Sequence, residues 1–223
     1  MKRTIYILQI IVLSLLISCQ KDTAINPKNL IDTNSNSFTI GTQTWMKKNL
    51  DIDHYRNGDP IPQVTDSSEW FSLTTGAWCY FNNDSSNGKL YGKLYNFYAV
   101  SDPRGLAPAG WHVPSDSEWT VLTNYLGGEE VAGRKMKYSA GIYPGHVPDS
   151  NATGESGFNV MLGGFRYVTG EFYDFGYSTH FWSTTPAGIG TNWERDFFYG
   201  LPFVYRYFSC AQMFGYSVRL IKD

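Results

Sequence analysis

Apolar residues recur at helical spacing in one stretch of the chain, residues 110–128. The residues that share one helical face there are Trp119, Leu122 and Leu126. Ser115 and Glu118 have the spacing of a capping box, in which the hydroxyl accepts from the N–H of Glu118 and the carboxylate accepts from the N–H of Ser115. Gly127 or Gly128 offers the left-handed residue that ends many helices. The pattern predicts a helix that begins after Ser115.

Most of the remaining pattern is the alternation of apolar and polar residues that is typical of β-strands. It predicts a hairpin or a bent strand around Gly41 and a strand pair over residues 158–172. The other strands that it predicts lie at residues 77–81, 180–184, 193–198, 204–208 and 216–221. Residues 90–100 fit a strand or a short helix, and residues 69–73 fit a short helical or irregular segment. The segments with the composition of turns or loops are residues 56–62, 82–88 and 134–148.

The first residues have the pattern of an export signal. Two basic residues precede a mostly apolar run, residues 5–17, which is too short to cross a bilayer as a helix. The run ends in Leu16-Ile17-Ser18-Cys19, which resembles the lipobox of bacterial lipoproteins. The resemblance implies that residues 1–19 are a lipoprotein signal peptide and that Cys19 carries diacylglycerol and an acyl chain such as palmitate. An ordinary signal peptide and a signal anchor are the alternatives.

Residues 20–36 are rich in Asn, Asp, Ser and Thr, which is typical of a flexible tether, and the folded domain then occupies residues 37–223. Gln20-Lys21-Asp22 is similar to the charged signal that sends lipoproteins of the Bacteroidota to the cell surface. A hydrophilic start to the tether is the alternative. We therefore expect a lipid-anchored protein of the outer membrane, exposed at the cell surface.

The composition and the net charge limit the kinds of molecule that this chain is expected to bind. The chain of 223 residues is 42% hydrophobic and 17% charged, as in globular proteins, and is long enough for one domain with a sizeable core. Its formal net charge of -2, without a cluster of Lys or Arg, argues against a nucleic-acid partner. Its 16 tyrosines exceed what core filling alone needs.

Blocks of sequence at residues 39–50, 55–62, 91–96, 110–115, 155–158, 181–184 and 215–219 carry a family resemblance. They resemble the Fibrobacter succinogenes major paralogous domain, and the resemblance covers essentially all of residues 38–223. It implies an exported or surface lipoprotein, and it brings no established activity with it.

A wider resemblance indicates the fold. Residues 113–119 are similar to the Leu-Pro-Thr-Glu-Ala-Glu-Trp segment that opens a helix in formylglycine-generating-enzyme-like proteins. The resemblance implies an α+β, C-type-lectin-like domain of twisted antiparallel strands, with one or two helices and long irregular loops. A shared fold does not by itself imply a shared function.

The sequence offers little metal or cofactor chemistry. Cys79 and Cys210, the only cysteines after Cys19, can form one disulfide in an oxidising compartment, or Cys79 can be a buried free thiol, or the pair can hold a metal. No two of the four histidines stand at a metal-binding spacing. The EF-hand-like run that begins at Asn83 has Leu94 where a bidentate Glu is required. We therefore expect no metal and no cofactor. We also expect no catalytic residue, because its role in the capping box already accounts for Glu118.

The aromatic segment at residues 165–182 is the best candidate for a ligand site. Within it Tyr173, Asp174 and Tyr177 are expected in a loop, and Trp193 in a neighbouring strand. Aromatic rings stack on sugars and present a polar edge. The alternative is that these rings fill the core.

Two classes of function follow from these patterns. The first is a non-enzymatic recognition module, anchored to the membrane through its lipid, that binds an extracellular glycan, another polymer or a protein. The second is an enzyme with an unrecognised site on a formylglycine-generating-enzyme-like fold. A structural component of a cell-surface assembly is a further alternative.

Overall fold

The computed structural model describes residues 36–139, 148–209 and 211–223. The chain divides into two units, Met1–Ile31 and Asp32–Asp223, and every described residue belongs to the second unit. The predicted signal peptide with Cys19, almost all of the predicted tether, and Cys210 lie outside the described residues. Within the described part of the chain, no helix has both the length and the hydrophobicity that crossing a membrane requires.

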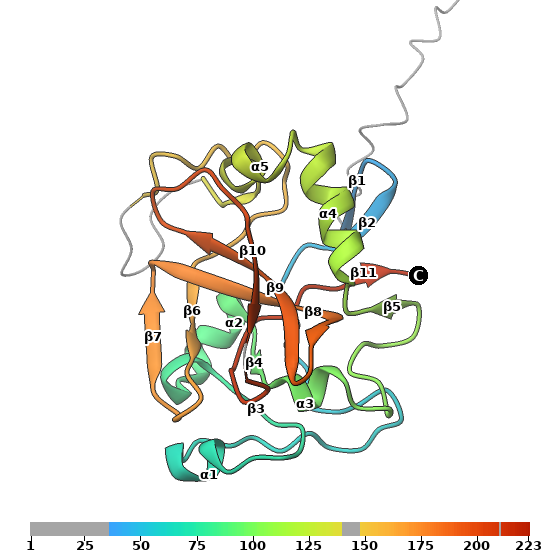
Figure 1. The fold of residues 1–223 in the computed structure, drawn as a ribbon, viewed down its shortest axis with the longest axis vertical. Helices are drawn as coiled ribbons and strands as arrows, with labels where there is room; N and C mark the ends of the chain where they lie inside the picture. The colour runs from blue at the N-terminus through green and yellow to red at the C-terminus, as the bar shows by residue number, and fades with distance from the viewer. Residues whose placement is uncertain (1–35, 140–147, 210) are drawn as a thin grey trace, which may run out of the picture. The chain divides into compact units, whose positions relative to one another are not determined.

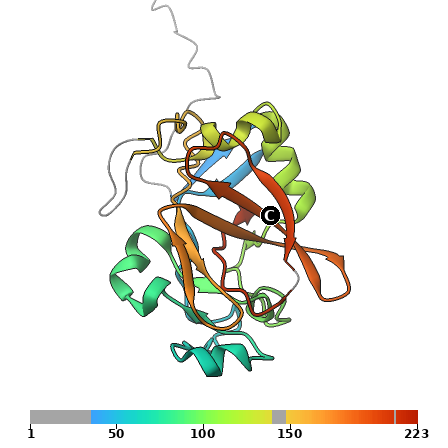
Figure 2. The same ribbon diagram turned by 60° about the vertical axis from the view of Figure 1, so that its left-hand side comes forward.

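The larger sheet has five strands in the order β10-β9-β8-β6-β7 (Figure 1). The strands are β6 (Gly163–Arg166), β7 (Phe172–Phe175), β8 (Ser178–Gly188), β9 (Thr191–Phe198) and β10 (Tyr205–Ser209). Neighbouring strands are antiparallel except β6 and β8, which are parallel. In Figure 2 the tip of the long β8–β9 hairpin, in orange, projects past the neighbouring strands. Because side chains alternate along a strand, this hairpin presents a different set of residues to each of its two faces.

A four-stranded sheet, β1-β2-β11-β5, brings the two ends of the described domain together. β1 (Ser37–Ile40) and β2 (Gln43–Met46) form the predicted hairpin around Gly41. β11 (Ile221–Lys222) pairs with both β2 and β5 (Trp111–His112). A two-stranded sheet of β3 (Trp78–Cys79) and β4 (Leu94–Tyr95) completes an α+β architecture of several antiparallel sheets.

The predicted helix is present as α4 (Asp116–Tyr125), and its capping box is complete. The Ser115 hydroxyl accepts from the N–H of Glu118 at 3.3 Å, and the Glu118 carboxylate accepts from the N–H of Ser115 at 2.7 Å. Trp119 and Leu122 are fully buried in a core cluster. The cluster also contains Trp45 of the four-stranded sheet and Phe181 and Phe197 of the five-stranded sheet. The buried face of α4 therefore packs between the two sheets.

The remaining helices are short: α1 (Ser67–Phe71), α2 (Gly88–Tyr91), α3 (Phe97–Val100) and α5 (Glu129–Met136). The loop predicted from Arg134 onward is wrong at its start, because α5 extends to Met136. Acidic residues in its first turn and basic residues in its last turn suit the helix dipole. Gly133 faces the backbone of Phe203, where a Cβ would lie 2.0 Å from the carbonyl oxygen. That glycine weakens the sequence signal of a helix that tertiary packing stabilises.

Two fully buried arginines, Arg166 and Arg219, hold irregular segments in place. Arg166 donates to the carbonyl oxygens of Val64 at 2.6 Å and Gly170 at 2.9 Å. Arg219 donates to the Phe158 carbonyl at 2.8 Å and to the side-chain oxygen of Asn49 at 2.7 Å. Buried carbonyls outside sheets and helices need such donors. Burial lowers the pKa of Arg219 to about 9.

Candidate functional site

A pocket of about 310 Å³ lies on the β6–β7 hairpin, and its walls are Phe165, Tyr167, Tyr173 and Asp174. The antiparallel register sets Phe165 opposite Tyr173, with ring centroids 6.0 Å apart. Tyr167 stands edge-on to Tyr173 at 5.9 Å. Cross-strand partners point to the same face of a sheet, which brings Phe165 and Tyr173 together. Asp174 interrupts the regular alternation with a left-handed backbone (φ 60°) and also lines the pocket.

His180 of β8 lies against the pocket wall. Its ring meets the ring of Phe165 edge-on at 4.7 Å and stacks on Tyr216 at 5.0 Å with an interplanar angle of 19°. His180 is 9% exposed and Tyr216 is 4% exposed. The two aromatic neighbours therefore fix the plane of the imidazole.

Hydrogen bonds connect the pocket to the interior of the β8–β9 hairpin. Asp174 accepts from the Ser178 hydroxyl at 3.3 Å, and Ser178 Oγ lies 3.1 Å from Nε2 of His180. Nδ1 of His180 lies 2.9 Å from Oδ1 of Asp196, its direct cross-strand partner. A carboxylate in the pocket wall is thus linked through two side chains to a buried carboxylate.

Glu194 lies two residues before Asp196 and on the same face of β9. A ligand atom from each of His180, Glu194 and Asp196 lies within 4.8 Å of the other two. Glu194 is 4% exposed and Asp196 is 5% exposed. Burial and then the charge of Asp196 raise the pKa of Glu194 to about 9, and a hydrogen bond with Tyr216 acts in the opposite direction. Two carboxylates share a small buried space here, which makes the doubly ionised state costly.

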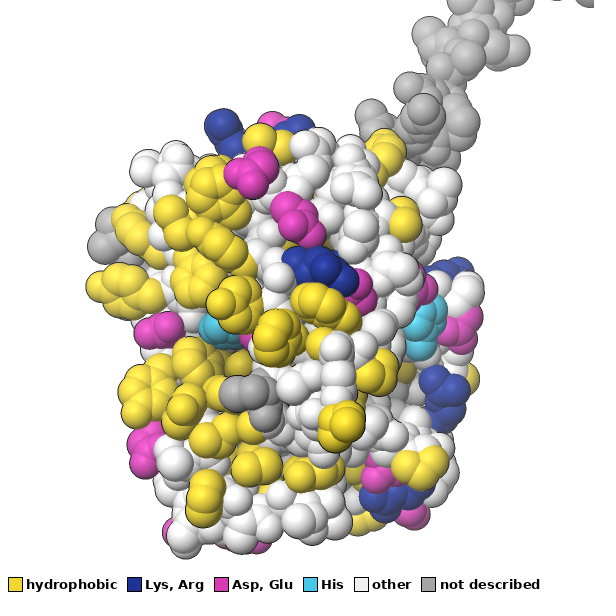
Figure 3. Space-filling model, viewed as in Figure 1, with side chains coloured by type: hydrophobic (Ala, Val, Ile, Leu, Met, Phe, Trp, Pro, Cys, Tyr) yellow, Lys and Arg dark blue, Asp and Glu magenta, His cyan; other side chains and the backbone are white. Residues whose placement is uncertain are grey.

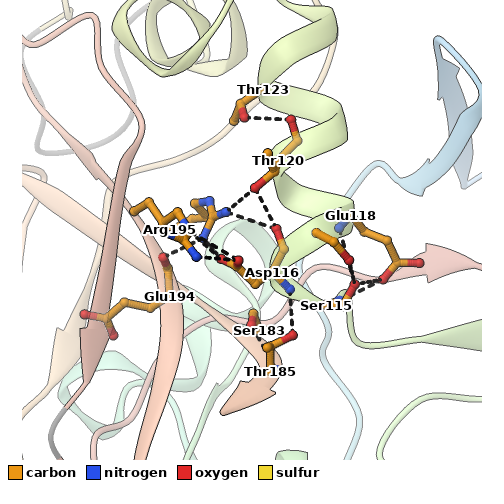
Figure 4. A network of polar contacts seen from close by, with 11 residues as sticks. Ser115, Asp116, Glu118, Thr120, Thr123, Ser183, Thr185, Glu194 and Arg195 are labelled. Carbon is orange, nitrogen blue, oxygen red and sulfur yellow. Dashed lines mark hydrogen bonds and ion pairs between the residues drawn. The ribbon is translucent and has the colours of Figure 1, made fainter. Parts of the chain in front are cut away.

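The opposite face of β9 carries a different network. Figure 4 shows Arg195 pointing toward α4 while Glu194 points away from it. Arg195 donates to Asp116 at 2.7 Å, and Arg206 of β10 donates to the same carboxylate at 2.8 Å. The guanidinium of Arg206 lies 3.6 Å from the ring centroid of Trp193. This network pins β9 and β10 to the first turn of α4.

The structure brings together two of the four predicted ligand residues. Tyr173 and Asp174 line the pocket, on β7 rather than in a loop. Tyr177 follows them in the turn to β8, is 68% exposed, and stands edge-on to Tyr199 at 6.2 Å. Trp193 is on the Arg195 side of β9, so the structure does not bring it together with Tyr173. The strand alternation of β9 separates it from the residues that face His180.

Further aromatic rings are exposed outside the pocket. Figure 3 shows apolar side chains gathered on the face of the molecule that carries β10 and the β6–β7 hairpin. The exposed residues of these elements and of the segments that flank them include Tyr167, Tyr173, Tyr177, Tyr199, Tyr205, Tyr207 and Phe208. β10 is also an edge strand of its sheet. This face is suited to an extended partner.

The order Ser178–His180–Asp196 is that of a nucleophile, a base and the group that orients the base. Ser178 is fully buried, however, and its hydroxyl is directed to Asp174. In this arrangement the serine positions the imidazole and offers no oxygen to a substrate. Glu118 acts as the predicted cap and also pairs with His112 at 2.8 Å.

Cys79 is a free thiol, fully buried in a core cluster with Trp70 and Phe81. Burial raises its pKa to about 12. Of the alternatives that the sequence left open for Cys79, the structure has the buried free thiol. Its proposed partner, Cys210, lies outside the described residues.

Sequence reasoning missed Glu194 and Asp196, and it found no metal-binding spacing among the four histidines, of which His180 is one. The available signal was the spacing Ser-x-His at 178–180, at the start of the strand predicted over residues 180–184, and Glu-x-Asp at 194–196, within the strand predicted over residues 193–198. Pairing these strands as a hairpin places the residues on one face. The register that achieves this contains bulges near the hairpin tip, and the sequence does not reveal them.

The described fold and site can be set beside a match to a known family. The family model of the Fibrobacter succinogenes major domain matches residues 38–222, in agreement with the resemblance found in the sequence. Searches of the curated proteins and of the solved structures gave no significant match.

Proposed function

Because this chain belongs to the Fibrobacter succinogenes major domain family, we propose from its own site that it is a lipid-anchored recognition module of the cell surface. The module binds an extracellular glycan or a similar polymer and carries out no chemistry on it. Its scaffold is C-type-lectin-like, a proposal that rests on the resemblance of residues 113–119 and on the mixture of α4 with twisted antiparallel strands.

The observation that carries the proposal is the composition of the pocket. Three aromatic rings and the Asp174 carboxylate line a space of about 310 Å³, which matches one or two sugar rings rather than a long buried substrate. The C–H faces of a sugar pack on aromatic rings, and its hydroxyls donate to a carboxylate. The Ser178 hydroxyl holds Asp174 from behind, so the acceptor is positioned before the ligand arrives.

The other exposed aromatic residues of this sheet favour a polymer, rather than a free monosaccharide, as the ligand. Tyr177, Tyr199 and Tyr207 are 68%, 37% and 60% exposed; Tyr177 precedes β8, Tyr199 follows β9, and Tyr207 lies on β10 of the same sheet. Exposed aromatic rings contribute area at a low cost in side-chain entropy. Additional units of a bound polymer can pack on them, each contact adding to the affinity of the first.

The lipid anchor at Cys19 and the tether at residues 20–36 complete the proposal. Acyl chains contribute about 0.8 kcal/mol per buried CH₂, so several chains hold the protein firmly to a membrane. The tether leaves the binding face free to reach a polymer outside the cell.

Two measurements test the proposal. Labelled palmitate is incorporated into the wild-type chain and not into Cys19→Ala, and protease added to intact cells removes the domain. The purified full-length protein in detergent is then applied to an array of plant, fungal and bacterial polysaccharides, where we expect retention by at least one class. Absence of label, protection from protease, or no retention on any polysaccharide contradicts the corresponding part of the proposal.

The enzymatic alternative rests on the Ser178–His180–Asp196 arrangement. Full burial of Ser178 argues against it, because a substrate carbonyl cannot reach the hydroxyl. A structural assembly role rests on the exposed edge of β10 and requires self-association of the purified protein, which light scattering measures.

A further inference from the structure

The face of the β8–β9 hairpin behind the pocket concentrates three groups that ligate metals. Nδ1 of His180 and the carboxylates of Glu194 and Asp196 converge because His180 pairs with Asp196 and Trp182 pairs with Glu194 in the antiparallel register. Each of the three residues is less than a tenth exposed. The geometry points to a binding site for one divalent transition-metal ion, in the first place zinc, held by His180, Glu194 and Asp196.

A buried carboxylate oxygen without a hydrogen-bond partner favours a bound cation over a purely structural cluster of side chains. Oε2 of Glu194 is fully buried and has no hydrogen-bond partner in the structure. An unsatisfied buried carboxylate oxygen is costly, and most buried polar atoms do find a partner. The adjacent positive charge, Arg195, is committed to Asp116 on the other face of the strand (Figure 4). A dication at the centre of the cluster would give the free oxygen a partner and would neutralise both carboxylates.

The distances agree with tetrahedral coordination after a small adjustment. Ligands about 2.1 Å from a zinc ion stand about 3.4 Å apart. The cluster atoms already lie within 4.8 Å of one another, and one pair, His180 Nδ1 and Asp196 Oδ1, is 2.9 Å apart. That pair therefore has to separate by about half an ångström.

The second ring nitrogen of His180 has the partner that a metal-bound histidine usually has. With Nδ1 on the metal, Nε2 carries the proton and donates to Ser178 Oγ at 3.1 Å. The Ser178 hydroxyl then donates to Asp174 at 3.3 Å. Such outer contacts fix the tautomer and the ring orientation of a ligating histidine. The stacked ring of Tyr216 holds the same plane.

The ligand set selects among metals. One imidazole nitrogen with two carboxylates suits zinc and its first-row neighbours. Calcium and magnesium prefer shells made only of oxygen, with six or more ligands for calcium. Three protein ligands leave one tetrahedral position, and at this burial a water molecule is the ligand that fits.

Isothermal titration of the full-length protein, purified in detergent and stripped with EDTA, tests the site. We expect one equivalent of Zn²⁺ to bind, Mn²⁺ to bind more weakly, and Ca²⁺ to give no saturable heat at the same concentrations. Co²⁺ in place of Zn²⁺ is expected to give the visible absorption of a four-coordinate nitrogen and oxygen site. Calcium binding in preference to zinc, or no stoichiometric binding of any of these ions, overturns the inference.

Variants locate the ion. Glu194→Gln keeps the size of the side chain and is expected to weaken Zn²⁺ binding at least tenfold, and Ser178→Ala to weaken it about 10- to 100-fold through loss of ring orientation. His112 also lies between two carboxylates, Glu118 at 2.8 Å and Asp223 at 2.7 Å, so His112→Gln is the matched control. Unchanged affinity in Glu194→Gln, or loss of binding in His112→Gln instead, overturns the assignment. Circular dichroism confirms that each variant is folded, and if Glu194→Gln fails to fold, Asp196→Asn takes its place with the same expected loss.

The proposed metal site and the proposed polymer binding can be refuted independently of each other. Zinc titration needs no polysaccharide, and polysaccharide retention is measured in the presence of EDTA and of Zn²⁺ separately. Retention without stoichiometric zinc binding rejects only the metal site, and zinc binding without retention rejects only the recognition role.

Discussion

Replacing Asp116 by alanine removes the carboxylate that neutralises a buried arginine. The side chain of Arg195 is 0% exposed and that of Asp116 is 13% exposed, with a contact of 2.7 Å. Arg195 keeps hydrogen bonds to the Asp116 carbonyl at 3.1 Å and to the Thr120 hydroxyl at 3.0 Å, but neither group carries a charge. The variant therefore leaves a buried cation without a counter-charge.

The expected loss of stability follows from burial. Removing one partner of a buried ion pair costs about 3–5 kcal/mol. The second pair, with Arg206, adds at most about 1 kcal/mol because the Arg206 side chain is 37% exposed and solvent screens it. Since 1 kcal/mol shifts the melting temperature by about 2–4 °C in a domain of this size, the variant should melt about 6–24 °C lower.

Urea unfolding followed by tryptophan fluorescence measures the change in the free energy of unfolding. The matched control is Glu130→Ala, an exposed acid in the first turn of α5, for which we expect a change within about 0.5 kcal/mol. A loss below about 1 kcal/mol in Asp116→Ala would refute the reasoning, because it would mean that solvent already screens Arg195.

Other predictions concern the cap, a titrating pair and the buried thiol. Ser115→Ala should lower the free energy of unfolding by about 0.5–2 kcal/mol in urea melts, since α4 loses its cap. Burial alone would lower the pKa of His112, but hydrogen bonds to Asp223 and Glu118 outweigh it and raise that pKa. The interaction of His112 with these carboxylates therefore stabilises the fold fully below pH about 6.5, and this contribution is lost as the pH rises through the folded pKa. Urea melts at several pH values should show the free energy of unfolding falling over this range, and His112→Gln should abolish that dependence. In a Cys210→Ser variant, Cys79 should react with a thiol reagent only at the rate of unfolding; rapid labelling of the native protein would contradict its burial.

Patterns among residues that are close together in the sequence correctly predicted the elements whose geometry depends on those same residues. The capping box of Ser115 and Glu118, the apolar face of α4 and the hairpin around Gly41 are all confirmed, because each depends on residues close together in the chain. α5 was missed because Gly133 weakens the helical signal, and only the packing against Phe203 explains that glycine. Helix propensity is a weak guide where tertiary contacts decide.

The candidate site was predicted in part for the same reason. Tyr173 and Asp174 are neighbours in the sequence and line one pocket, whereas His180, Glu194 and Asp196 converge only through strand pairing. Trp193 lies in a strand, as predicted, but side chains alternate across β9, so it does not share a face with the residues that approach His180. Register is therefore the piece of information that composition and motifs could not supply.

The central claim is that the pocket on the β6–β7 hairpin binds a polysaccharide, and affinity electrophoresis tests it most directly. Full-length protein is run in detergent-containing native gels cast with the soluble polysaccharide that retains it best on the array. We predict retardation of the wild type, loss of retardation in Tyr173→Ala, and unchanged retardation in Tyr125→Ala, a control ring on α4 that is 62% exposed. Equal retardation of the wild type and Tyr173→Ala would contradict the claim.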